Sequence, residues 1–237
     1  MSLRIGAALP CLLFVVPLFA QDFSARHQHS KGFCTGAVSI TPNGIAYAQA
    51  GDEQIIGEKR HTFSWTFEDI EQLEISTTAL NVVIAEARMF FTGGDRELRF
   101  SGDFARAYLR LKDRMDQRLI ARLADDQVDP LWKIPVLRLG RTKGSDGELL
   151  IGAERLVFKA SAQELSRTWR YTDIEQISAS GPFELSIASP ERTKTSYRGR
   201  RVYSFQLKQA LSKTRYEELL QRLDRKQNQR RQESARD

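Results

Sequence analysis

One phrase occurs twice in the chain, and this repetition limits the possible folds more than any other feature. The stretch "HTFSWTFEDIEQLEIS" covers residues 61–76, and "SRTWRYTDIEQISAS" covers residues 166–180. Trp65 and Trp169 are 104 residues apart, and the Asp-Ile-Glu-Gln run after each tryptophan keeps the same separation. Self-similarity at a fixed separation indicates a duplicated structural unit.

Matching patterns surround the two phrases in the same order. A glycine-opened hairpin pattern precedes each phrase, and two strand patterns and a helical pattern follow it. The predicted hairpins cover 36–48 and 147–160, the strands 80–86, 96–102, 183–189 and 201–207, and the closing helices 104–123 and 209–226. The fold class is therefore predicted to be mainly β (α+β), with two tandem units that each end in an amphipathic helix.

This combination resembles the pleckstrin-homology-like (PH-like) superfold, in particular the bacterial PH and GRAM-type domains. The resemblance rests on the glycine-opened hairpin, a "W-x-[YF]-x-D-I" strand end, two more strands and the closing helix, and it covers residues 36–123 and 147–226. It implies that each unit is a bent antiparallel sheet or small barrel with the helix over one open end. The basic first hairpin of eukaryotic lipid-binding PH domains is absent, so phosphoinositide binding is not implied.

The residues of the repeated phrase are interpreted as structural. Aromatic residues alternate into the core and the chain then bends at an aspartate, which suits a turn. The repeated positions are Trp65, Asp69, Ile70, Trp169, Asp173 and Ile174. The alternative is that the tryptophan pair forms a ligand platform.

The two ends of the chain define the predicted domain boundaries. Arg4 is followed by an uncharged run over 5–20 that is short for a membrane helix, which predicts a signal peptide cleaved near Ala20 and an exported, periplasmic or secreted protein. An uncleaved anchor is the alternative. The predicted layout is 1–20 signal peptide, 21–126 first PH-like unit, 127–146 extended packed linker, 147–226 second PH-like unit and 227–237 disordered basic tail.

Charge is distributed unevenly along the chain. Residues 21–130 hold 13 Lys and Arg against 17 Asp and Glu, a net charge of 13 − 17 = −4, whereas residues 131–237 hold 22 against 13, a net charge of 22 − 13 = +9. The acidic first unit could dock against the basic second unit, or the basic surface could attract an anionic partner.

Four residues of the first unit could bind a metal ion. His27, His29 and His61 are the only histidines of the sequence, and Cys34 lies between them. Imidazole and thiolate groups are the donors that zinc and copper prefer, and a closed site needs about four of them. Their spacing matches no familiar zinc finger, so metal binding or thiol chemistry requires these four residues to converge in the fold.

Catalytic motifs are not found in the sequence. It contains no Gly-x-Ser-x-Gly elbow, no phosphate-binding loop and no His-Glu-x-x-His helix. We therefore predict no catalytic residues, no enzymatic activity and no cofactor.

A basic loop is the other candidate binding site. The predicted hairpin over 192–201 has one tyrosine among five cations, which attract lipid head groups, acidic polymers or an acidic protein surface. Its residues are Arg192, Lys194, Tyr197, Arg198, Arg200 and Arg201.

Three functional hypotheses follow. The preferred one is a non-enzymatic tandem binding or scaffold module of the cell envelope that recognises a protein or an anionic envelope component. The second is an adaptor for anionic surfaces, with peripheral membrane contact, through the 192–201 hairpin. The third is a metal-binding or thiol-active protein that uses the histidines and Cys34. Nucleic acid is excluded as a partner because an exported protein does not meet it, and the sequence predicts no oligomeric state.

Overall fold

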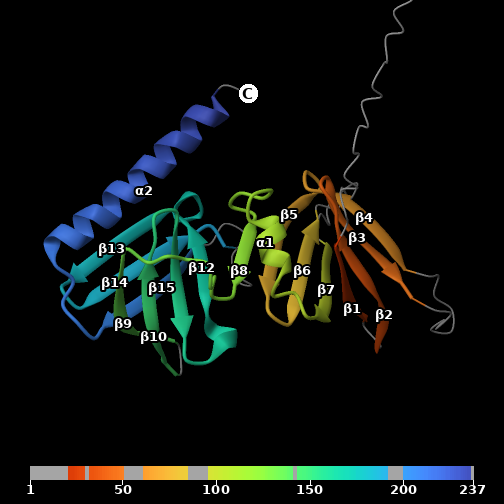
Figure 1. Cartoon of the computed structure of the whole chain (residues 1–237), viewed down its shortest axis with the longest axis horizontal. Coiled ribbons are helices and arrows are strands. Elements are labelled where there is room, and N and C mark those ends of the chain that lie inside the picture. The colour runs from red at the N-terminus through yellow and green to blue at the C-terminus, as the bar shows by residue number, and fades with distance from the viewer. Residues whose placement is uncertain are drawn as a thin grey trace, which may run out of the picture.

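The protein is mainly β, as predicted. The structure is a computed structural model that describes residues 21–29, 32–50, 61–84, 96–140, 143–191 and 200–235. These residues contain one sheet of fifteen strands, two α-helices and two 3-10 helices (Figure 1). The predicted signal peptide lies outside the described residues.

The first seven strands form one half of the sheet, which we name the first set. Their bounds are β1 (Gln21–His29), β2 (Gly32–Ile40), β3 (Gly44–Gln49), β4 (Thr62–Thr66), β5 (Ile70–Ser76), β6 (Ala79–Ile84) and β7 (Arg96–Gly102). They lie in the order β5-β6-β7-β1-β2-β3-β4. The pairings within the set are antiparallel.

The last seven strands repeat this arrangement as the second set. Their bounds are β9 (Trp132–Arg138), β10 (Ser145–Ile151), β11 (Arg155–Ala160), β12 (Arg167–Arg170), β13 (Gln176–Gly181), β14 (Glu184–Ser189) and β15 (Arg201–Leu207). Their order is β13-β14-β15-β9-β10-β11-β12, which matches the first set strand for strand. The repeat found in the sequence is thus a repeat of strand order.

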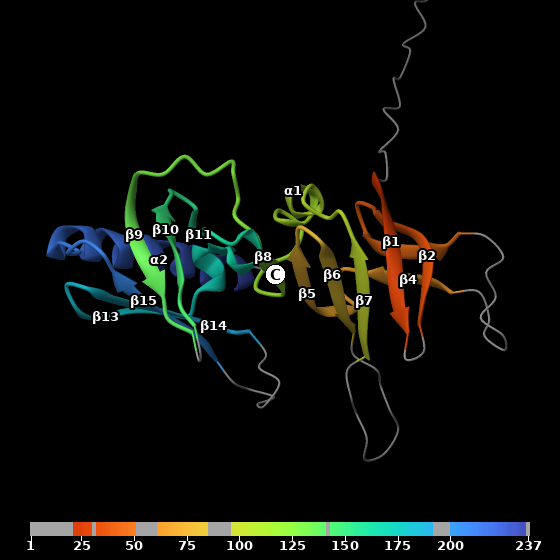
Figure 2. The ribbon, with the colours of Figure 1, turned by 90° about the horizontal axis from the view of Figure 1, so that it is seen from below.

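One short strand joins the two sets. β8 (Leu119–Arg122) pairs in parallel with β5 and antiparallel with β12, where Thr168 lies opposite Ala121. Figures 1 and 2 show β8 in the middle of the molecule with one set on each side. The sheet is therefore continuous through both sets.

Glycine is required at matched positions of the two sets. Gly36 on β2 and Gly147 on β10 both lie where the neighbouring hairpin strand approaches closely. An added Cβ would be 2.3 Å from the Ala48 carbonyl oxygen at Gly36 and 2.4 Å from the Lys159 carbonyl oxygen at Gly147. This close approach is the physical reason for the glycine that opens both predicted hairpins.

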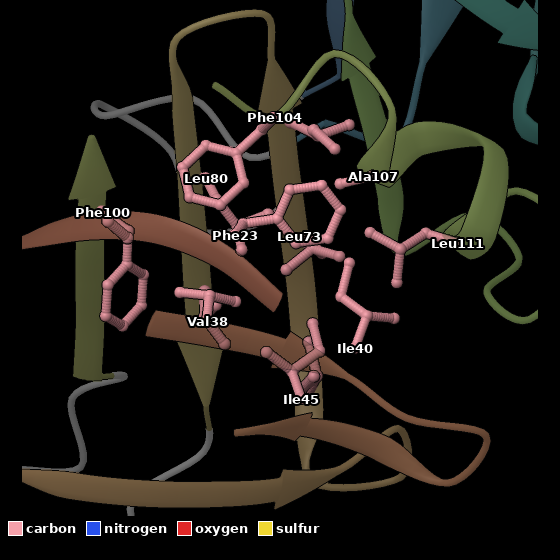
Figure 3. Close-up of a cluster of buried hydrophobic side chains, with 14 of the residues drawn as sticks. Phe23, Val38, Ile40, Ile45, Leu73, Leu80, Phe100, Phe104, Ala107 and Leu111 are labelled. Atoms are coloured by element: carbon pink, nitrogen blue, oxygen red, sulfur yellow. The ribbon is translucent and has the colours of Figure 1, made fainter. Parts of the chain in front are cut away.

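Each set encloses its own hydrophobic core. In the first set, Val38, Ile45 and Leu80 are fully buried on facing strands, and Phe104 packs over them from the segment after β7 (Figure 3). In the second set, Trp169 and Phe205 meet edge to face with their ring centroids 6.4 Å apart. Most strands bury every second side chain, because only one face of the strand packs against the core. This is why the period-2 pattern of the sequence predicted most of them.

The predicted helix over 104–123 is wrong for most of its length. Helix α1 spans only Ala107–Leu111, and the chain then turns at Asp116 and enters β8. Leu119, Ile120 and Ala121 are buried at consecutive positions, so both faces of β8 are covered. A short apolar run that is buried on both faces cannot be distinguished from a helix by periodicity.

The second closing helix is longer than predicted. Helix α2 spans Lys213–Ser234, so residues 227–234 belong to it and the predicted disordered tail is wrong there. Gln227 donates to the Ile174 carbonyl oxygen at 2.8 Å, and Arg230 lies 3.8 Å from Asp116. These contacts tie the last turns of α2 to the fold.

The predicted linker over 127–146 includes strand structure. It contains β9, which pairs with both β10 and β15, together with the start of β10. The segment is extended and packed, as predicted, but it belongs to the second set, which begins near residue 132 rather than at 147. Pro135 fits within β9, although Pro cannot donate to a ladder.

The repeated phrase has a structural role. Trp65, Trp169, Ile70 and Ile174 are buried. Asp69 accepts a hydrogen bond from the Thr66 backbone N–H at 2.7 Å, which is the turn role that the sequence predicts. The matched aspartate of the second set differs, because Asp173 is buried and pairs with Arg170 at 2.6 Å.

Candidate metal centre

The four predicted metal-binding residues come from two paired strands of the first set and from the residue that precedes a third strand. His27 and His29 lie on β1, Cys34 lies on β2, and His61 directly precedes β4. His27 and Cys34 face each other across the β1–β2 ladder, which places their side chains on the same side of the sheet. β2 begins at Gly32, whose φ of +147° favours glycine.

The donor atoms of these four residues converge. One donor atom from each of His27, His29, Cys34 and His61 lies within 4.8 Å of all the others. The Cys34 Sγ is 3.9 Å from the His27 Nδ1 and 3.8 Å from the His61 Nδ1. The ring centroids of His29 and His61 are 4.5 Å apart, and those of His27 and His29 are 4.6 Å apart. The four residues therefore converge, as metal binding requires.

Burial differs among the four side chains. Cys34 and His27 are buried, at 1% and 6% exposure, whereas His29 and His61 are half-buried. The inner half of the cluster packs against aromatic rings, with the ring centroids of His27 and Phe100 5.1 Å apart. The cluster thus has a dry inner side and an outer side that solvent reaches.

Burial also controls the charge of the innermost imidazole. Burial, together with the nearby His29 and His61, lowers the pKa of His27 to about 4. His27 is therefore neutral at pH 7, and a neutral imidazole nitrogen has the lone pair that a metal ion needs.

Two further residues hold the donors in place. The Tyr47 hydroxyl lies 3.2 Å from the Cys34 Sγ and donates to the Cys34 carbonyl oxygen at 3.2 Å. Burial raises the pKa of Tyr47, and its hydrogen bond to Cys34 adds to the rise, so the phenol keeps its proton. The buried Gln49 side chain accepts from the His61 backbone N–H at 3.0 Å. Hydrogen bonds of this kind orient ligands in metal sites.

Sequence reasoning identified the four donors but missed these supporting residues. Tyr47 falls within the predicted hairpin over 36–48, Gln49 lies just beyond it, and β1 itself was not predicted. Phe23, Ala25 and His27 alternate into the core, so treating His27 as an inward-facing residue would have revealed the strand.

The predicted basic hairpin is only partly described. Arg192, Lys194, Tyr197 and Arg198 lie outside the described residues. Arg200 pairs with Glu175 at 2.6 Å, and Arg201 lies 3.9 Å from Glu191. These two arginines therefore also serve contacts within the fold.

Comparisons with known proteins find structural similarity but no match in sequence. No family model matches the sequence, and no curated protein matches it. Among solved structures it is similar to the C-terminal domain of an unknown protein from Leishmania infantum, with 12% identity and a TM-score of 0.31 over 51% of this chain and 94% of that one. It is also similar to the Spt16D Pob3N heterodimer, with 15% identity and a TM-score of 0.28 over 71% of this chain and 82% of that one. At these TM-scores neither similarity bears on function.

Within the part of the chain that the structure describes, no helix has the length and apolar character to cross a membrane.

Proposed function

We propose that this protein binds one zinc or copper ion through His27, His29, Cys34 and His61. The observation that carries the proposal is the convergence of their four donor atoms within 4.8 Å. The sequence alone ranked this hypothesis below a binding module and predicted no cofactor. The convergence of the donor atoms is our reason for placing metal binding first.

The separations of the donors suit a tetrahedral site. Bonds of about 2.0–2.3 Å at tetrahedral angles place neighbouring donor atoms roughly 3.3–3.8 Å apart. The Cys34 Sγ is already 3.8–3.9 Å from two imidazole nitrogens, so binding needs only small side-chain movements. One thiolate and three imidazoles are donors for zinc or copper rather than for magnesium or calcium.

The donor set favours binding over catalysis. Catalytic zinc sites keep a coordination position open for water or substrate, whereas four protein donors close a tetrahedral site. The half-buried His29 and His61 leave the ion one side through which it can enter and leave. We therefore propose a non-enzymatic metal-binding protein, with no catalytic residues assigned.

The setting of the site is part of the proposal. We propose that each set is a PH-like unit, supported by their shared strand order and by the C-terminal helix of the second set. We also propose export, supported by the signal-like sequence over 1–20.

A second candidate function draws on the ends of the sheet. β4 and β13 are its terminal strands, and a terminal strand can accept an extended peptide by strand addition. This observation favours the predicted protein-binding scaffold, and it is compatible with metal binding.

Metal content of purified full-length protein tests the main proposal. We expect about one equivalent of zinc or copper per chain by elemental analysis after loading under reducing conditions. His61→Ala should weaken binding by more than the roughly 10–100-fold that loss of a supporting hydrogen bond costs. Leu165→Ala is the matched control, because Leu165 occupies the equivalent position of the second set.

Two results would contradict the proposal. One is a chain that takes up neither ion above background, and the other is equal uptake by the His61→Ala and Leu165→Ala variants. A far-ultraviolet circular dichroism spectrum of each variant shows whether loss of metal is separate from loss of fold.

A further inference from the structure

The second set places an arginine where the first set places a metal donor. Arg138 lies opposite Ser145 on β10 and Phe205 on β15, as His27 lies opposite Cys34 on β2 and Phe100 on β7. Arg138 therefore occupies the position of His27, and Ser145 that of Cys34.

The neighbouring strands extend this match. Arg167 lies opposite Phe158 on β11, as Phe63 lies opposite Tyr47 on β3. Arg167 therefore occupies the position that Phe63 has in the first set, and it is the second arginine at this end of the second set.

Three guanidinium groups surround one aromatic ring at this end. The Cζ atoms of Arg138, Arg201 and Arg167 are 5.0, 5.3 and 6.0 Å from the ring centroid of Tyr203. Burial lowers the pKa of Arg138, and the positive charges of Arg201 and Arg122 lower it further. Four arginines are therefore close enough to repel one another, which is costly unless anions lie between them.

Among the described residues, the carboxylates that pair with these arginines neutralise only half of this charge. Glu191 pairs with Arg167 and accepts hydrogen bonds from Tyr203 at 2.7 Å and Ser189 at 2.9 Å. Glu74 pairs with Arg122 at 3.0 Å. Four guanidinium groups against these two carboxylates leave a net charge of 4 − 2 = +2.

Arg167 has hydrogen-bonding capacity that the fold does not use. Its side chain is 5% exposed, yet its Nε and Nη1 have no hydrogen-bond partner among the described residues. The Nε of Arg122 is also buried and has no hydrogen-bond partner among the described residues. Guanidinium N–H groups that are buried and unpartnered in a native protein call for an explanation, and a bound anion provides one.

We propose that Arg138, Arg167, Arg201 and Arg122 form a binding site for a phosphate-type oxyanion. A phosphate monoester has a charge of about −1.5 to −2 near pH 7 and three acceptor oxygens, which matches the excess charge and the unpartnered N–H groups. Arg201 and Arg122 keep 34% and 35% of their side-chain surface exposed, and this gives the anion its route to Arg167. The site uses no residue of the metal centre, so the two proposals stand independently.

Phosphate titration of the full-length protein tests the site. We expect saturable binding of inorganic phosphate by isothermal calorimetry, and we expect Arg138→Gln and Arg201→Gln each to weaken it about tenfold, the size of one charge-assisted hydrogen bond. Arg215→Gln is the matched control, because Arg215 stacks on Trp132 at the opposite end of β9 and its loss removes the same charge. Arg167 is left unchanged, because its buried pairing with Glu191 makes loss of fold a competing explanation.

A second arm identifies the source of the phosphate group. Sedimentation with phosphatidic acid vesicles, compared with phosphatidylcholine vesicles, shows whether the site accepts a lipid head group. The site is supported if binding of phosphate or of phosphatidic acid vesicles falls in Arg138→Gln and Arg201→Gln but not in Arg215→Gln. The probe that binds then identifies the ligand. Absence of binding in both arms, or an equal loss in Arg215→Gln, overturns it.

Discussion

The first and second sets have the same strand order and the same register, but their matched positions have different chemistry. The first set brings imidazoles and a thiol together around Tyr47, whereas the second brings guanidinium groups together around Tyr203. The strand ladder fixes which side chains meet at the end of each set. The identity of those side chains then decides whether the end attracts a cation or an anion.

The contrast also extends to how each end is held together. His27, Cys34 and their neighbours form a cluster with few charges, and the lowered pKa of His27 keeps its imidazole neutral. The second set instead relies on the buried pair of Arg167 and Glu191. We therefore expect single substitutions at the two ends to have effects of different kinds and sizes.

The largest expected effect is in the second set. Glu191→Gln should lower the free energy of unfolding by about 3–5 kcal/mol, because it leaves Arg167 as a buried charge without a partner. The measurement is urea denaturation followed by circular dichroism. Glu97→Gln is the control, because Glu97 pairs with Arg99 on the exposed face of β7 and such pairs contribute about 0–1 kcal/mol. Equal effects of the two substitutions would contradict this view of the second set.

The same pair predicts a dependence on pH. Burial favours the neutral form of Glu191, but Arg167 and hydrogen bonds from Tyr203 and Ser189 outweigh burial and lower its pKa. Its contribution to stability is then present above the ordinary glutamate pKa of 4.5 and is lost as the pH falls below that value. The difference in free energy of unfolding between wild type and Glu191→Gln should therefore become smaller in acid.

An intermediate effect is expected at the metal centre. Tyr47→Phe should weaken zinc binding by about tenfold, roughly 1.4 kcal/mol, because the Cys34 sulfur and carbonyl lose their hydroxyl partner. Competition titration with a chromogenic chelator measures the change. Tyr171→Phe removes a comparable buried hydroxyl from the second set, where it donates to the Gly152 carbonyl oxygen at 3.1 Å. Weaker metal binding in that variant would show that the effect is not local.

The smallest expected effect compares the two helices. The Ser212 hydroxyl accepts from the Arg215 backbone N–H at the start of α2, whereas the shorter α1 has no side-chain cap. Ser212→Ala should therefore lower the free energy of unfolding by about 1 kcal/mol, and Ser212→Asp should restore most of it. Thermal unfolding of the two variants gives the comparison, and an unchanged Ser212→Ala midpoint would mean that the cap is dispensable.

Much of the fold could be predicted because strand patterns are local. Period-2 burial marks β7 and β15, whose bounds match the predicted 96–102 and 201–207, and glycine marks the two hairpins. The segment after residue 111 could not be predicted in this way. β8 is a strand because β5 and β12 flank it, and that information lies about 45 residues away in either direction along the chain.

The candidate site was predictable in its residues but not in its geometry. Histidine and cysteine could be named as donors from chemistry alone. Whether they meet depends on the register of β1 against β2 and on the position of His61 before β4, which no local pattern specifies. The arginine cluster escaped prediction for the same reason, since Arg122, Arg138, Arg167 and Arg201 come from four different strands.

β8 has a consequence for any attempt to separate the two halves of the protein. It occupies the edges of both β5 and β12, so a chain cut on either side of it leaves at least one of those strands with open backbone N–H and C=O groups. Such a fragment would present a template for pairing with another copy of itself. Isolated halves should therefore dimerise or aggregate through that edge, and only a piece that holds β8 together with β5 and β12 keeps both of these edges paired.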